Sequence, residues 1–220
     1  MKIFGFRFDI DHEYGLNKGI PNILNLAREY NLKFSFFINM GKVFDLKEFI
    51  EMRKNKEDPS LKKISIKNKL SNFRLLKAVL VNPNVGLSNV KMLQRIKDDG
   101  HELGLHGGMN HMNWHRGLDR MSDIQLEKSF SRSYNLFKNL FGSPEGFVSP
   151  GFRWKKNVLD LIDKYGIKYS GDMFYKEPFY PSYSGKKYKH MQIPLNVVGS
   201  PYTIPIIEWL CANNKSENEI

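Results

Sequence analysis

The chain has a single cysteine, Cys211, in 220 residues, so an internal disulfide framework is excluded. No apolar run approaches the ~20 residues that a membrane-spanning helix needs. The first residues, Met1 to Phe6, run directly into a strand-like pattern instead of the charged and then apolar pattern of a secretory leader. These absences predict a cytoplasmic protein without disulfides.

Acidic residues are scarce relative to basic ones, with 23 Asp and Glu against 34 Lys and Arg and a formal net charge of +11. Such an excess favours an anionic partner, which could be a nucleic acid, an anionic membrane surface or a phosphorylated substrate. The alternative is a solvated lysine-rich surface without a specific partner. The sequence contains no nucleic-acid-binding motif, so we expect no nucleic-acid partner.

Strand and helix patterns alternate along the chain. Residues 2–11 place phenylalanines and Ile10 on one face of a strand, and a helix over 17–30 and a buried strand over 33–39 follow. This succession predicts a parallel sheet. Further strands are expected at 101–106, 146–149, 167–169, 191–195 and 202–207. Further helices are expected at 44–53, at 88–99 with Ser88 as its cap, at 122–142 with a Ser122–Gln125 capping box, and at 154–165.

Polar side chains gather where these strands end. In parallel α/β folds the carboxyl ends of the strands carry the functional residues. Those ends carry, in order, Asp9 and Asp11, the segment His106 to His111, Arg153, and Asp172. Asp9 and Asp11 lie on one face of their strand, where two like charges repel each other unless a cation lies beside them.

Four of the six histidines fall between residues 101 and 115. Neutral imidazole is a common ligand for zinc and similar ions, although a polar loop that happens to be rich in histidine is the alternative. A zinc ion held by two histidines and one carboxylate keeps an open position for water and lowers the pKa of that water to about 7. A second carboxylate can accept the proton of the water, and an arginine can keep that carboxylate ionised. The set therefore predicts a hydrolase.

Four segments, Phe8-Asp-Ile-Asp11, Gly100-His-Glu-Leu-Gly-Leu-His106, the turn at Arg153 and Tyr169-Ser-Gly-Asp172, resemble the polysaccharide deacetylase (NodB-homology, carbohydrate esterase 4) family. They resemble most the branch that deformylates undecaprenyl-phosphate-linked 4-formamido-arabinose. The resemblance covers nearly the whole chain. It implies an α/β fold, a distorted and incomplete (β/α) barrel, in one domain over residues 1–212, with a lysine-rich insertion around 55–86 and a polar tail at 213–220.

The resemblance also implies roles for individual residues. Asp9 would be the catalytic base, Arg153 would hold Asp9, and Asp11 and His106 would be metal ligands. The expected site residues are Asp9 and Arg153 for catalysis, Asp11, His106 and His111 for the metal, and Trp114 and Asp172 for substrate contact. Zinc is the expected ion, and cobalt or nickel fits the same ligands.

The third metal ligand is ambiguous in the sequence. The family places it four residues after His106, at the position of Asn110, and a histidine, His111, follows one residue later. His111 and Trp114 keep the interval found in the lipid-sugar branch. We therefore interpret the glycine-containing loop before them as carrying a one-residue insertion, with His111 as the ligand and His115 as a spare.

One family feature is missing from the motif set. The last strand of the family supplies a histidine as general acid, and the stretch Tyr202-Thr-Ile-Pro contains none. His190 is the only late histidine, and it is expected at the wrong end of its strand.

Two hypotheses about function follow from the sequence. The first is a metal-dependent hydrolase that removes an acetyl or formyl group from an amino sugar, including a lipid-phosphate-linked one, with peripheral contact to an anionic membrane through residues 54–81. The alternative is a catalytically impaired member that binds carbohydrate or lipid-linked sugar.

Overall fold

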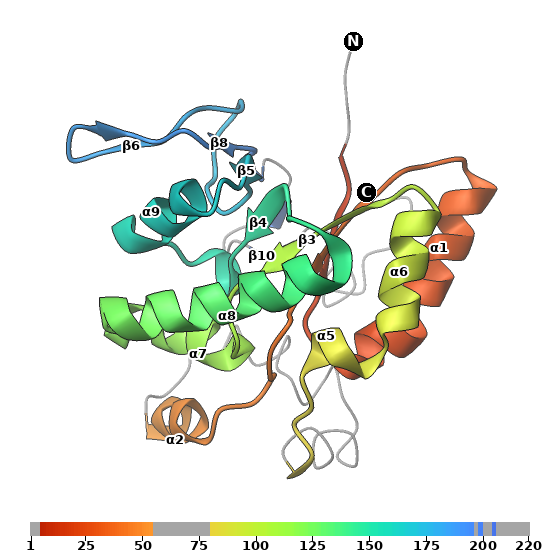
Figure 1. Cartoon of the computed structure of the whole chain (residues 1–220), viewed down its shortest axis with the longest axis horizontal. Helices are drawn as coiled ribbons and strands as arrows, with labels where there is room; N and C mark the ends of the chain where they lie inside the picture. The colour runs from red at the N-terminus through yellow and green to blue at the C-terminus, as the bar shows by residue number, and fades with distance from the viewer. Residues whose placement is uncertain (1–4, 55–79, 196–197, 200–203, 206–220) are drawn as a thin grey trace.

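A six-stranded sheet forms the centre of the computed structural model (Figure 1). The structure describes residues 5–54, 80–195, 198–199 and 204–205. Most of the expected lysine-rich insertion, most of the expected membrane-contact segment and the expected tail at 213–220 lie outside these residues. The strand order is β1-β2-β3-β4-β5-β8, and each neighbouring pair is parallel. The expected α/β fold is confirmed, and the described sheet is open, as an incomplete barrel requires.

The strands of the sheet are short and follow the expected ranges. They are β1 (Arg7–Ile10), β2 (Ser35–Ile38), β3 (Glu102–His106), β4 (Gly146–Val148), β5 (Tyr169–Ser170) and β8 (Met191–Gln192). Two antiparallel pairs lie outside the sheet, β6 (Ser182–Tyr183) with β7 (Lys186–Lys187) and β9 (Val198–Gly199) with β10 (Ile204–Pro205). The helices are η1 (Gly15–Gly19), α1 (Ile20–Glu29), α2 (Leu46–Lys54), α5 (Val85–Ser88), α6 (Val90–Asp98), α7 (His111–Gly117), η3 (Leu118–Arg120), α8 (Asp123–Phe141), η4 (Pro150–Phe152) and α9 (Lys156–Lys164).

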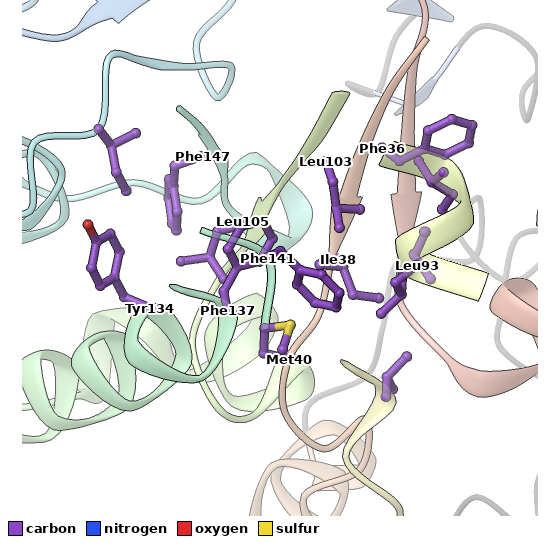
Figure 2. Close-up of a cluster of buried hydrophobic side chains, with 14 of the residues drawn as sticks. Phe36, Ile38, Met40, Leu93, Leu103, Leu105, Tyr134, Phe137, Phe141 and Phe147 are labelled. Carbon is purple, nitrogen blue, oxygen red and sulfur yellow. The ribbon is translucent and has the colours of Figure 1, made fainter. Parts of the chain in front are cut away.

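The strand register places apolar side chains in rows on one face of the sheet. Ile10, Ile38, Leu105 and Phe147 are aligned across four strands, and all four are at most 2% exposed. Side chains of α1, α6, α8 and α9 join them in one hydrophobic cluster, part of which Figure 2 shows. Burying each large apolar side chain contributes about 1.5–3 kcal/mol, so this layer fixes the sheet. Alternate residues of the strands point to the opposite face, where the polar groups lie.

Local signals set the helix ends. The Ser122 hydroxyl accepts from the Gln125 amide and the Gln125 side chain accepts from the Ser122 amide, so the expected capping box of α8 is confirmed. The expected cap of α6 is wrong by one residue. The Ser88 hydroxyl donates to the Val85 carbonyl of α5, and Asn89 accepts the amide of Met92 instead. No helix among the described residues is long and apolar enough to cross a membrane.

Candidate metal centre

The carboxylates of the site come from β1 and the residue after it. Asp9 lies in β1, on the face opposite Ile10, and Asp11 follows the end of the strand. The backbone of Asp11 is held by Asn39, which is fully buried and donates its side-chain amide to the Asp11 carbonyl at 3.2 Å. The residue that follows β2 therefore holds the backbone of Asp11 in place at the end of β1.

His106 ends β3, and its ring is fixed by the next strand. It is 2% exposed, and its Nδ1 lies 3.1 Å from the carbonyl oxygen of Val148. A carbonyl can only accept, so in the neutral ring Nδ1 carries the hydrogen and Nε2 has a free lone pair. This is the arrangement that orients a histidine toward a metal ion.

His111 begins α7 after a tight loop. Asn110 caps this helix by accepting the amide of Asn113 at 3.0 Å, so His111 stands at the first helical position. The loop needs its two glycines: Gly107 has a φ of 66°, and a Cβ on Gly108 would lie 2.3 Å from the indole nitrogen of a neighbouring tryptophan. The glycine pair thus allows the chain to turn and bring His111 back over the end of β3.

Three side chains converge at this point. Asp11 Oδ1 lies 3.1 Å from His106 Nε2 and 3.2 Å from His111 Nε2. The ligand atoms of the three residues all lie within 4.8 Å of one another. The Asp11 side chain is 38% exposed, but its Oδ1 is buried and makes no hydrogen bond with the described residues. Three close acceptor atoms without a hydrogen bond between them fit a shared cation, so the residues present suit a divalent metal ion.

The electrostatics of the cluster agree with this fit. Burial would raise the pKa of Asp11, but His111 and His106 lower it well below its ordinary value. Burial would lower the pKa of His106, but Asp9 and Asp11 raise it above its ordinary value. Each group therefore favours its charged form only because opposite charge lies beside it. A metal cation would take the place of the imidazolium charge beside Asp11 and would bind His106 as the neutral ring.

The other two candidates for the third ligand lie outside the cluster. Asn110 has its amide nitrogen 3.1 Å from Asp45 Oδ2 and uses its oxygen as the cap of α7. The ring of His115 lies 6.1 Å from the ring of His111, one helical turn further on. Burial, followed by the charge of His111, lowers the pKa of His115 to about 3, so this ring is neutral. The structure thus brings His111 to Asp11 and His106, and its role as a ligand stays a prediction.

The arginine at Asp9 is not the expected one. Arg153 pairs with Asp119 on the surface, with side chains 43% and 65% exposed. Arg7 takes the expected place: its Nε donates to Asp9 Oδ1 at 2.7 Å and its Nη2 to Asp9 Oδ2 at 2.6 Å. The guanidinium carbon of Arg7 lies 5.2 Å from the centre of the Phe152 ring, whereas the side chain of the next residue, Arg153, reaches Asp119. The alternation of β1 was the available signal, because Arg7 and Asp9 share one face.

Trp114 was expected to contact substrate, and the structure places it in the core instead. It is completely buried, and its indole nitrogen donates to Ser129 Oγ at 3.0 Å. Its ring packs against Phe130 of α8 and Phe147 of β4. The Trp114 side chain therefore serves packing in this chain.

Replacing Trp114 with alanine should lower the free energy of unfolding by about 4 kcal/mol, because it leaves a large cavity in the core. Urea unfolding would measure the change. Trp154→Ala is the matched control, since Trp154 is 40% exposed, and we expect a loss of about 1 kcal/mol or less. A stable Trp114→Ala protein with weakened substrate binding would restore the original expectation.

Asp172 is likewise buried instead of facing a substrate. It is 2% exposed, and its Oδ1 accepts the Ser149 amide at 2.6 Å. Burial raises the pKa of Asp172 to about 6, although Arg7 and the Ser149 amide act in the opposite direction. Its side chain joins the end of β4 to the end of β5, so the expected direct substrate contact is not what the structure shows.

His190 lies at the opposite end of the sheet from the metal cluster. It precedes β8, is 1% exposed, and its Nδ1 lies 2.7 Å from Asp163 Oδ1. Asp163 also accepts the amides of Lys189 and His190, which joins the end of α9 to the start of β8. The expectation that His190 sits at the wrong end of its strand is confirmed, and this residue cannot act on a group bound at Asp11.

Comparison with known proteins gives a consistent result. The family model described as polysaccharide deacetylase matches residues 4–170. A protein of Shewanella sediminis, designated a 4-deoxy-4-formamido-L-arabinose-phosphoundecaprenol deformylase, is 24% identical over 183 residues, which are 80% of this chain and 58% of that protein. A protein of the same designation from Wigglesworthia glossinidia brevipalpis is 24% identical over 187 residues, covering 83% of this chain and 64% of the relative.

A solved structure supports the fold. A protein of Mycobacterium smegmatis designated a polysaccharide deacetylase superposes with a TM-score of 0.58 at 16% identity, covering 87% of this chain and 58% of the other. At this identity the likeness concerns the arrangement of the elements and not the activity. The chain spans 58% and 64% of the length of the two sequence relatives, so the activity of those whole proteins is not transferred by the match alone.

Proposed function

The chain belongs to the polysaccharide deacetylase family, and from this premise we propose that it removes an N-acyl group, acetyl or formyl, from an amino sugar by metal-dependent hydrolysis. The observation that carries the proposal is the convergence of Asp11, His106 and His111 beside a separate carboxylate, Asp9. Two histidines and one carboxylate form a catalytic type of site, which leaves coordination positions open.

The residues around the site divide the chemistry between them. Asp11, His106 and His111 would hold the ion, which when bound supplies an acidified water and a positive charge that polarises the acyl carbonyl. Asp9 would act as the general base and accept the proton of the attacking water. Arg7 donates to both oxygens of Asp9, which keeps the carboxylate oriented for that transfer.

The proposal extends to a lipid-phosphate-linked sugar as the substrate class. Two relatives are designated deformylases of a sugar carried on phosphoundecaprenol. The net charge of +11 suits an anionic substrate held at a membrane surface. Peripheral contact with anionic lipid is part of the same proposal, as is zinc as the ion, with cobalt or nickel as substitutes.

A substrate comparison tests the function. The zinc-loaded protein would be given N-acetylglucosamine oligomers and, separately, a formamido sugar on a polyprenyl phosphate, and released acetate or formate would be measured. We expect release of one acyl group that stops when a chelator removes the metal and that is absent in Asp11→Asn. Full metal loading without release of either group would refute the hydrolase, and retained sugar binding in that case would support the non-catalytic alternative.

A further inference from the structure

Arg7 lies in β1, two residues before Asp9, and donates hydrogen bonds to both oxygens of that carboxylate. We propose that Arg7 is a positioning residue that keeps Asp9 out of the coordination sphere of the metal, so that only one of the two carboxylates of β1 becomes a ligand. This inference rests on the metal site of the proposed function. It assigns a role to a residue that the motifs of the sequence did not single out.

The first support is that Arg7 uses both oxygens of Asp9. The two bonds, Nε to Oδ1 at 2.7 Å and Nη2 to Oδ2 at 2.6 Å, form a fork that matches the planar carboxylate. Asp9 is correspondingly missing from the group of converging ligand atoms, although it is two residues from Asp11. The pairing therefore separates two like carboxylates that one divalent ion would otherwise attract.

The second support is that Arg7 is itself held in place. Its third nitrogen, Nη1, donates to the carbonyl of Gly171 at 2.6 Å. Its guanidinium carbon lies 5.6 Å from the centre of the Phe37 ring and 5.2 Å from that of Phe152. Burial would lower the pKa of Arg7, but Asp9 raises it above its ordinary value, so the side chain stays charged. The Arg7 side chain is 16% exposed, and each of its three nitrogens donates a hydrogen bond. These contacts hold the guanidinium against Asp9.

Removing the fork should therefore change the metal site and not only the activity. Without Arg7, the Asp9 carboxylate has two unpaired oxygens close to a divalent ion, and hard oxygen ligands bind such ions readily. Asp9 would then add a ligand to Asp11, His106 and His111. With the metal-bound water retained, the coordination number would rise, and the carboxylate would no longer be available as a base.

Cobalt reports this change directly, because the intensity of its visible absorption falls as its coordination number rises. The cobalt-loaded full chain would be compared with Arg7→Gln, and we expect the intensity per bound ion to fall several-fold in the variant. The double variant Arg7→Gln with Asp9→Ala should return to the wild-type spectrum, because the added ligand is gone. Arg28→Gln, which breaks a surface pair with Asp99 (2.9 Å), is the matched control and should keep the spectrum.

The possible outcomes are distinct. The inference would be overturned if the cobalt spectrum of Arg7→Gln matched that of the wild type, or if the spectrum changed in Arg153→Gln and not in Arg7→Gln. Either result would leave the proposed function intact. Wild-type protein that binds no cobalt would refute the proposed metal site, and this inference with it. If Arg7→Gln does not fold, Arg7→Lys keeps the charge but not the fork, and an unchanged spectrum in that folded variant also overturns the inference.

Discussion

Replacing His106 with alanine is expected to weaken metal binding by more than about 100-fold, because even the loss of a group that only orients a ligand costs about 10–100-fold. His106 supplies one of the three converging atoms, at 3.1 Å from Asp11 Oδ1, and its ring is fixed by the Val148 carbonyl. Asp11→Asn should act in the same direction, since the neutral amide is a weaker ligand. Metal content after purification and dialysis would measure both variants.

His115→Ala is the matched control for the His106 variant. The ring of His115 is only 6.1 Å from that of His111, but it lies outside the converging group, so metal content should be retained. Metal loss in His115→Ala with retention in His111→Ala would show that the wrong histidine was assigned. Metal loading of the wild type should also fall in acid, because protons compete for His106 as the pH drops through its raised pKa.

Replacing Asp9 with asparagine is expected to lower turnover by about 1,000-fold, the range found when a general base is removed. Metal content should be unchanged, because Asp9 is not among the converging ligands and both its oxygens face Arg7. The combination of lost turnover with retained metal separates a base from a ligand. Acyl release and bound zinc, measured on the same preparation, would check it.

Asp119→Asn is the matched control for this variant. Asp119 also pairs with an arginine, Arg153, but on the surface, and its loss should change turnover little. An equal fall in Asp119→Asn would bring Arg153 back into the catalytic set. Loss of metal in Asp9→Asn would instead identify Asp9 as a ligand in the wild type.

The patterns of the sequence determined the sheet and the rim at which the site lies. Alternating residues in β1 place Asp9 away from the helix-facing Ile10, and parallel strands bring Asp11 and His106 to the same edge. Capping residues and glycines located the helix ends because those signals act within a few residues, as Ser122 with Gln125 shows. Such short-range and periodic effects can be predicted without any knowledge of distant contacts.

Only the tertiary structure decided which long side chains reach which partner. The sequence is compatible with either Arg7 or Arg153 as the partner of Asp9. In the folded chain Arg7 pairs with Asp9, and Arg153 pairs with Asp119. The cap at Asn110 determined that His111 starts α7, and with it which histidine meets Asp11. Packing of helices on the sheet likewise buried Trp114 and Asp172. Each outcome depends on contacts between segments far apart in the chain, and these have no local pattern by which to predict them.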